Sequence, residues 1–127
     1  MILKTPIIPQ RIRRISGSFS WLDHRLLHDG FVQRMRIADL VLYFFLVLVG
    51  DKNGISYYSY DRMCELLKLS LDELISARDH LIDLSLIAFD NGRYQVLSLP
   101  GPPSEKPVLR RQQIVRLSEL LPAAVAR

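Results

Sequence analysis

Hydrophobic positions divide the middle of the chain into several short elements, the first of which is a strongly apolar helix. The longest apolar run, Leu40 to Val49, follows Asp39, whose carboxylate suits the positive end of a helix dipole. This pattern predicts a helix over residues 36–49. Because the helix is apolar on every side, it must be covered on every side. Two later helices can cover one side, and Trp21 and Leu26, the C-terminal segment or a second copy of the protein must cover the other.

A short strand and two further helices are expected after the turn at residues 51–54. Residues 55–58 are β-favouring, and Ser59 is placed to cap a helix that runs to about Leu67. The next helix begins at Ser70, because Ser70 and Glu73 have the spacing of a capping box. Its inner stripe consists of Leu74, Ala77, Leu81 and Leu84.

Residues 86–97 predict a β-hairpin. The pair Asn91-Gly92 is the preferred sequence of a two-residue type I′ turn. Such a turn places Phe89 opposite Tyr94 and Asp90 opposite Arg93. The hairpin would turn four side chains toward the core, namely those of Ile87, Phe89, Tyr94 and Val96.

Taken together, these elements predict a mostly helical α+β fold: a winged helix-turn-helix with a three-helix core, a small antiparallel sheet and a β-hairpin wing. Ahead of the first strong helix, a short helical turn ending at Gly30 would direct Trp21, Leu22, Leu26 and Phe31 toward the core. We divide the chain into a basic arm (1–18), the winged-helix domain (19–99), a linker (100–107) and a C-terminal helix (108–127).

The order and spacing of core and turn positions also indicate a family. The residues concerned are Leu26-Leu27, Asp29, Leu42-Tyr43, Asp51, Gly54, Ser59, Met63, Leu66, Ser70, Leu74, Leu81 and Leu86-Ile87. From about Phe19 to Leu99 the chain resembles, without gaps, the winged-helix modules of plasmid and phage replication initiators and of small mobile-element proteins. The resemblance implies the fold above all. It also implies nucleic-acid binding in a regulatory or replication-related role.

Three positions depart from that family pattern. The chain has Lys68 in the turn and Ser85 before the Leu-Ile pair, where glycine is usual. The reading helix usually opens with basic or small hydroxyl residues, but here it opens with Leu71-Asp72-Glu73. Its outward face would carry no fixed positive charge, because it consists of Asp72, Glu73, Ser76, Asp79, His80 and Asp83. Carboxylates repel phosphates, and only a single Asp or Glu commonly accepts a hydrogen bond from a cytosine.

Charge is unevenly distributed along the chain. The net charge of +4 is the sum of +5 over residues 1–36, −4 over residues 37–99 and +3 over residues 100–127. Basic ends around an acidic middle indicate tails that contact a polyanion or that fold back on the middle.

These charges define two sets of candidate contacts. For duplex DNA, the arm cluster would track phosphates or enter a minor groove, with additional contacts from turns, wing and reading helix. The DNA candidates are Arg11, Arg13, Arg14, Lys52, Lys68, Ser76, His80 and Arg93. Alternatively, the acidic helix docks on a basic protein partner and the first helix supports a homodimer. The residues of that alternative are Asp72, Glu73, Asp79 and Asp83.

Nothing in the sequence indicates catalysis or a cofactor. There is no glycine-rich phosphate loop, no evident pair of catalytic carboxylates and no nucleophile with a base at a known spacing, so we expect a non-enzymatic protein without a small-molecule substrate. His24 and His28 are four residues apart but have no third ligand at a useful spacing, so no metal site is expected. The ten-residue apolar run is far shorter than the roughly 20 residues of a membrane span. We therefore expect a cytoplasmic protein.

Overall fold

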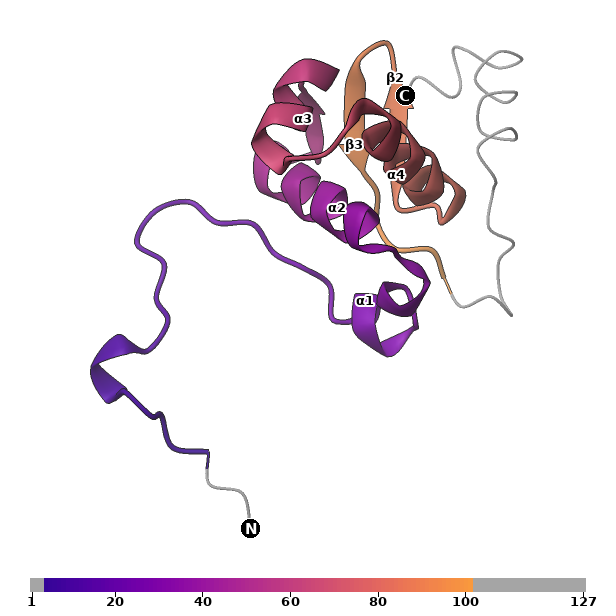
Figure 1. Cartoon of the computed structure of the whole chain (residues 1–127). Coiled ribbons are helices and arrows are strands. Elements are labelled where there is room, and N and C mark those ends of the chain that lie inside the picture. Colours follow the sequence, from indigo (N-terminus) through magenta and orange to yellow (C-terminus); the bar gives the residue numbers. More distant parts are fainter. Residues whose placement is uncertain (1–3, 102–127) are drawn as a thin grey trace.

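Helix α2 lies at the centre of the fold, between the other helices and the sheet (Figure 1). A computed structural model describes residues 4–101, so the predicted C-terminal helix and most of the linker lie outside the described residues. In chain order the elements are η1 (Pro9–Arg11), α1 (Arg25–His28), η2 (Val32–Arg34), α2 (Ile37–Val49), β1 (Ile55–Tyr57), α3 (Tyr60–Leu67), α4 (Leu71–Asp83), β2 (Ile87–Asp90) and β3 (Arg93–Val96). This is the winged helix-turn-helix fold that the sequence predicts.

Both helices of the helix-turn-helix start at the predicted capping residues. The Ser59 hydroxyl accepts a hydrogen bond from the Arg62 backbone N–H at 3.2 Å. At the start of α4, the Glu73 backbone N–H donates to the Ser70 hydroxyl at 3.1 Å, and the Ser70 N–H donates to the Glu73 carboxylate at 2.9 Å. These bonds satisfy N–H groups that have no partner within the helix, and the capping-box prediction is confirmed.

Two of the positions that depart from the family pattern have left-handed backbone. Lys68 ends α3 with φ of 58°, and Ser85 follows α4 with φ of 61°. Glycine is favoured at such positions because a Cβ atom clashes with the following carbonyl in this conformation. The tight turns into and out of α4 therefore form here at a backbone cost that glycine would avoid.

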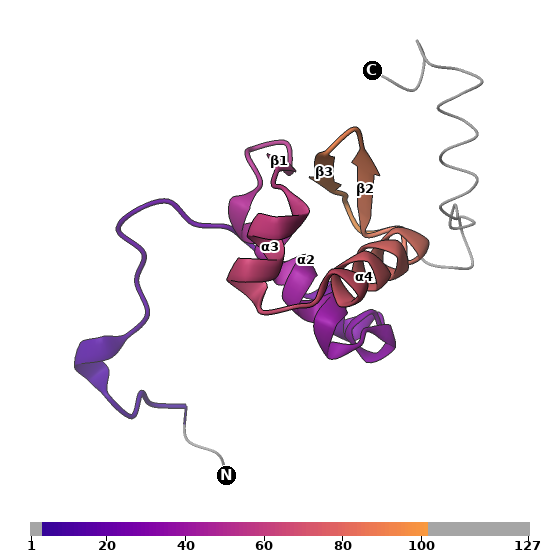
Figure 2. The same cartoon turned by 45° about the horizontal axis from the view of Figure 1, so that its top comes forward.

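The wing has the predicted register. β2 pairs with β3 so that Phe89 lies opposite Tyr94 and Asp90 opposite Arg93. Asn91 and Gly92 have φ values of 49° and 79°, as a type I′ turn requires. β1 pairs with the other edge of β3, which gives the order β1-β3-β2, and Figure 2 shows the hairpin rising beside α4.

The core lies between α2, α3, α4 and the sheet. Its fully buried side chains include Leu42, Leu46, Met63, Leu74, Leu81, Leu86, Ile87 and Tyr94. Leu26 and Phe31 also join it, as predicted. The prediction was wrong for Trp21 and Leu22, which are 78% and 49% exposed. Both residues precede α1, so the helical turn that brings Leu26 to the core does not extend to them.

Gly54 has no room for a side chain. A Cβ at this position would lie 2.7 Å from the Val96 carbonyl oxygen, and the backbone has φ of +79°. We expect Gly54→Ala to lower the free energy of unfolding by about 2–3 kcal/mol, because backbone strain and steric overlap add. Gly92→Ala is the matched control, since Gly92 has the same φ and nothing within 4 Å of the added Cβ. Urea denaturation should give it a loss of about 1 kcal/mol, from strain alone. Equal losses of stability for the two variants would show that overlap of the added Cβ with the Val96 carbonyl oxygen is unimportant.

Candidate nucleic-acid interface

The outer surface of α4 is acidic in the structure, as the sequence predicts. Asp72, Glu73 and Asp83 are exposed, and Asp79 is half-buried. An open hollow of about 690 Å³ lies over this surface. It is lined by Arg36, Asp72, Ile75, Ser76, Asp79, His80 and Asp83. The guanidinium of Arg36 is therefore a positive group at this surface, which the sequence did not indicate because Arg36 and Ser76 are 40 residues apart.

A hydrogen-bond network joins the start of α2 to the middle of α4. The Asp39 side chain is fully buried and accepts hydrogen bonds from the Arg36 backbone N–H at 2.9 Å and from Nη2 of Arg36 at 3.1 Å. Nδ1 of His80 donates to the same carboxylate. Nη2 of Arg36 also donates to the Ser76 carbonyl oxygen at 3.2 Å. The network fixes α4 against α2, and it holds the His80 ring on Asp39 rather than out in solution.

The Asp39 carboxylate stays ionised within this network. Burial alone would raise its pKa, but the hydrogen bond from the Arg36 backbone, those from the His80 and Arg36 side chains, and the charge of His80 together outweigh burial. The pKa of Asp39 is therefore lowered below its ordinary value. A buried carboxylate held in this way depends on its partners, because a buried ion without them is strongly destabilising.

Arg78 is the cation of α4, and it points inward to the wing. Its side chain is 17% exposed, and its guanidinium lies 4.9 Å from the centre of the Phe89 ring. It also donates hydrogen bonds to Tyr60 Oη and to Asp79. Arg78 was not among the predicted site residues, although its spacing of four from Leu74 and three from Leu81 places it beside the inner stripe. Arg78 joins α3, α4 and β2, so it does not add positive charge to the outer face of α4.

The other predicted DNA contacts are spread over several surfaces. Arg11, Arg13 and Arg14 are exposed on an arm that lies on the opposite side of the body from α4 in both views (Figures 1 and 2). Arg93 lies at the wing tip in an exposed pair with Asp90, at 3.4 Å. Lys52 is exposed in the turn after α2, Lys68 in the turn before α4, and Ser76 on α4 itself. The structure therefore does not bring the arm and the wing together.

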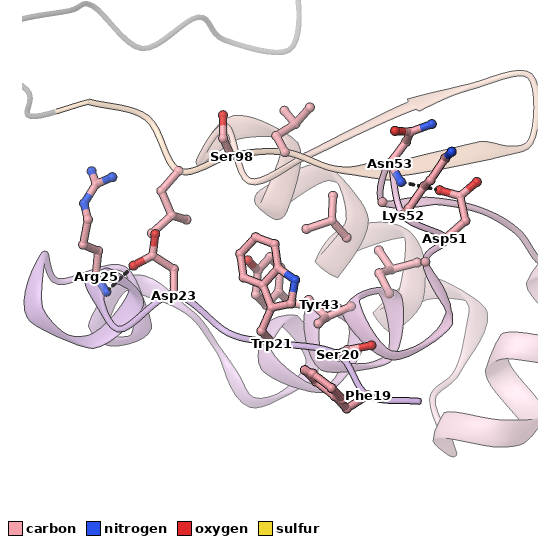
Figure 3. Close-up of a pocket in the computed structure, with 17 residues that line it drawn as sticks. Phe19, Ser20, Trp21, Asp23, Arg25, Tyr43, Asp51, Lys52, Asn53 and Ser98 are labelled. Carbon is pink, nitrogen blue, oxygen red and sulfur yellow. Dashed lines mark hydrogen bonds between the residues drawn. The ribbon is translucent and has the colours of Figure 1, made fainter. Parts of the chain in front are cut away.

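A second cavity, of about 560 Å³, lies on the other side of α2 (Figure 3). Trp21 and Tyr43 both line it, with Asp23 and Arg25 at one end and Asp51, Lys52 and Asn53 at the other. The two carboxylates bind the protein's own backbone: Asp23 accepts from the Arg25 N–H, and Asp51 from the N–H groups of Asn53 and Ile55. These bonds lower the pKa of Asp51. The fold therefore uses both carboxylates, and the cavity is also lined by Trp21, Tyr43, Leu46 and Val47.

Residues 35–87 match the model of a protein family described as a helix-turn-helix domain. This stretch is a helix-turn-helix module. The match runs from the start of α2 to the first residue of β2, so α3 and α4 are its two characteristic helices. It indicates DNA binding in general terms. Comparisons of the chain with curated proteins and with solved structures give no significant match.

Two further findings concern residues 4–101. None of their helices has both the length and the hydrophobicity needed to cross a bilayer. No three His, Cys, Asp or Glu side chains in this part of the chain gather closely enough to hold a metal ion. His24 and His28 do approach each other, with ring centroids 6.5 Å apart in an edge-to-face arrangement.

Proposed function

We propose that the protein is a non-enzymatic, cytoplasmic DNA-binding protein whose contacts come mainly from the arm and the wing, in a regulatory role or in replication of a mobile element. The observation that supports the proposal is the distribution of exposed charge around the helix-turn-helix. The outer face of α4 exposes three carboxylates, whereas exposed cations lie on the arm, at the wing tip and in the turns at Lys52 and Lys68.

Phosphate attraction is the main sequence-independent term in DNA binding, and it favours the unpaired arginines of the arm over Arg93 at the wing tip, which pairs with Asp90. Arg11, Arg13 and Arg14 form no ion pair with another described residue and have no acidic neighbour in the arm. The flexible arms of other small DNA-binding folds enter a minor groove in this way. The role in replication or regulation follows from the family resemblance.

Salt dependence tests the arm contacts. Replacing Arg11, Arg13 and Arg14 together by alanine should reduce the slope of log affinity against log salt by about 2.7, since each phosphate contact contributes about 0.9. Fluorescence anisotropy with labelled duplex DNA over a series of salt concentrations measures both slopes. The matched control is Arg62→Ala, an exposed arginine of α3 that is already paired with Glu65 at 3.1 Å. If the triple variant kept the wild-type slope while Arg93→Ala lost affinity, the arm would have no role.

A second candidate function is binding of a basic protein segment by α4. The hollow over α4 favours it, because the carboxylates of Asp72, Asp79 and Asp83 outnumber the one guanidinium, that of Arg36, in its lining. Under this alternative, α4 would be a protein-binding helix and DNA would be bound weakly or not at all.

A further inference from the structure

Helix α2 presents an entirely apolar stripe to solvent. Ile37, Phe44 and Leu48 are 76%, 55% and 54% exposed. Leu40, Val41 and Val47 lie between them and are half-buried. The spacing of three, four and seven residues puts all six on one side of the helix, with no polar residue among them. Val47, at one edge of this α2 stripe, also lines the cavity beside Phe19 and Trp21, whereas Ile37, Phe44 and Leu48 remain exposed.

The described part of the arm, residues 4–18, carries exposed apolar side chains between its cations. Ile7, Ile8, Ile12 and Ile15 are all exposed. Its regular structure is one 3-10 turn, in which the Arg11 N–H donates a hydrogen bond to the Ile8 carbonyl oxygen. Figures 1 and 2 both show the arm running away from the helical body rather than along α2. One chain therefore carries two exposed apolar surfaces that it does not bring together.

We propose that two copies of the protein exchange arms, with the arm of each copy packed on the α2 stripe of the other. The proposal does not depend on DNA binding, because it concerns the association of the protein alone. Exchange would bury isoleucines and the stripe at the same time, and burial of apolar surface drives association.

Charge favours the arm of a second copy over a direct contact between two α2 helices. The arm carries four cations, at positions 4, 11, 13 and 14, and no acidic residue. Residues 37–99 carry a net charge of −4, from five basic and nine acidic residues. Two such bodies repel each other when they meet face to face, whereas a basic arm is attracted to an acidic body. A second copy is favoured because the arm leads away from its own body.

Sedimentation of the full-length protein over a wide range of concentrations, without DNA, tests the proposal. We expect a monomer–dimer equilibrium. The stripe variant Phe44→Glu/Leu48→Glu and the arm variant Ile12→Glu/Ile15→Glu should each raise the dissociation constant at least tenfold. The control is Tyr57→Glu, because Tyr57 is an equally exposed apolar residue, on β1. All five substituted sites, the control included, are exposed in the monomer, so the circular dichroism melting curves should change little.

Mixing distinguishes arm exchange from other forms of association. The stripe variant has an intact arm and the arm variant has an intact stripe, so a mixed dimer has one complete arm–stripe contact. An equimolar mixture should therefore associate more tightly than either variant alone. The proposal is overturned if the wild type is a monomer at every concentration, if only the stripe variant weakens association, or if mixing restores nothing.

Discussion

Asp39→Ala is expected to lower the free energy of unfolding by about 3 kcal/mol, the lower end of the range for breaking a buried ion pair. The carboxylate is fully buried and joins Arg36, at the start of α2, to His80 on α4. Its loss removes the group that accepts from the backbone N–H of Arg36, the N-cap residue of α2, and leaves the His80 ring without its carboxylate partner. His80 and Arg36 are partly exposed and can regain water, which keeps the loss at this lower end. Urea denaturation at neutral pH measures the change.

The same substitution has a defined pH dependence. The folded-state pKa of Asp39 is lowered, so its ionisation stabilises the fold above the unfolded-state pKa near 3.8. That contribution is lost as pH falls below this value and through the folded-state pKa. The stability difference between wild type and Asp39→Ala should therefore shrink in acid, over the range in which the Asp39 carboxylate takes up its proton. Asp29→Ala is the control, because Asp29 pairs with Arg25 at 2.8 Å on the surface. Its effect should stay within about 0.5 kcal/mol. If both variants lost a similar amount of stability, burial of the Asp39 carboxylate would not explain the size of its effect.

Reversing charge on α4 is expected to strengthen DNA binding at least tenfold at low salt. Asp72 and Asp83 are exposed on the outer face of α4. In Asp72→Lys/Asp83→Lys, two groups that repel phosphates become two that attract them, and each new phosphate contact increases the salt slope by about 0.9. Anisotropy titrations at several salt concentrations measure both the affinity and the slope.

A matched variant separates position from net charge. Asp61→Lys/Glu65→Lys changes the net charge by the same amount on α3, where both acidic residues are exposed. An affinity gain confined to the α4 variant would place that helix beside the DNA, within the roughly 10 Å over which charges act at 0.1 M salt. Unchanged DNA affinity together with loss of a bound basic partner would instead support the protein-binding alternative.

The local elements could be predicted because their signals are short in sequence. Ser70 and Glu73 start α4 through bonds that span three residues, and Asn91-Gly92 closes the wing with a turn that fixes the pairing of Phe89 with Tyr94. The prediction for Trp21 and Leu22 was wrong because α1 is only four residues long, and hydrophobicity alone does not show where so short a helix begins.

By itself, the sequence determined the order of the elements, the winged helix-turn-helix class and the acidic outer face of α4, because propensity, capping and periodicity act within a few residues. Only the tertiary structure decided which side chains meet across elements. Asp39 and His80 are 41 residues apart, and Arg36 and Ser76 are 40 apart. Arg78 and Tyr60 are 18 apart. These contacts depend on how α4 packs against α2, α3 and the wing, and the complementary shape of packed side chains sets that geometry.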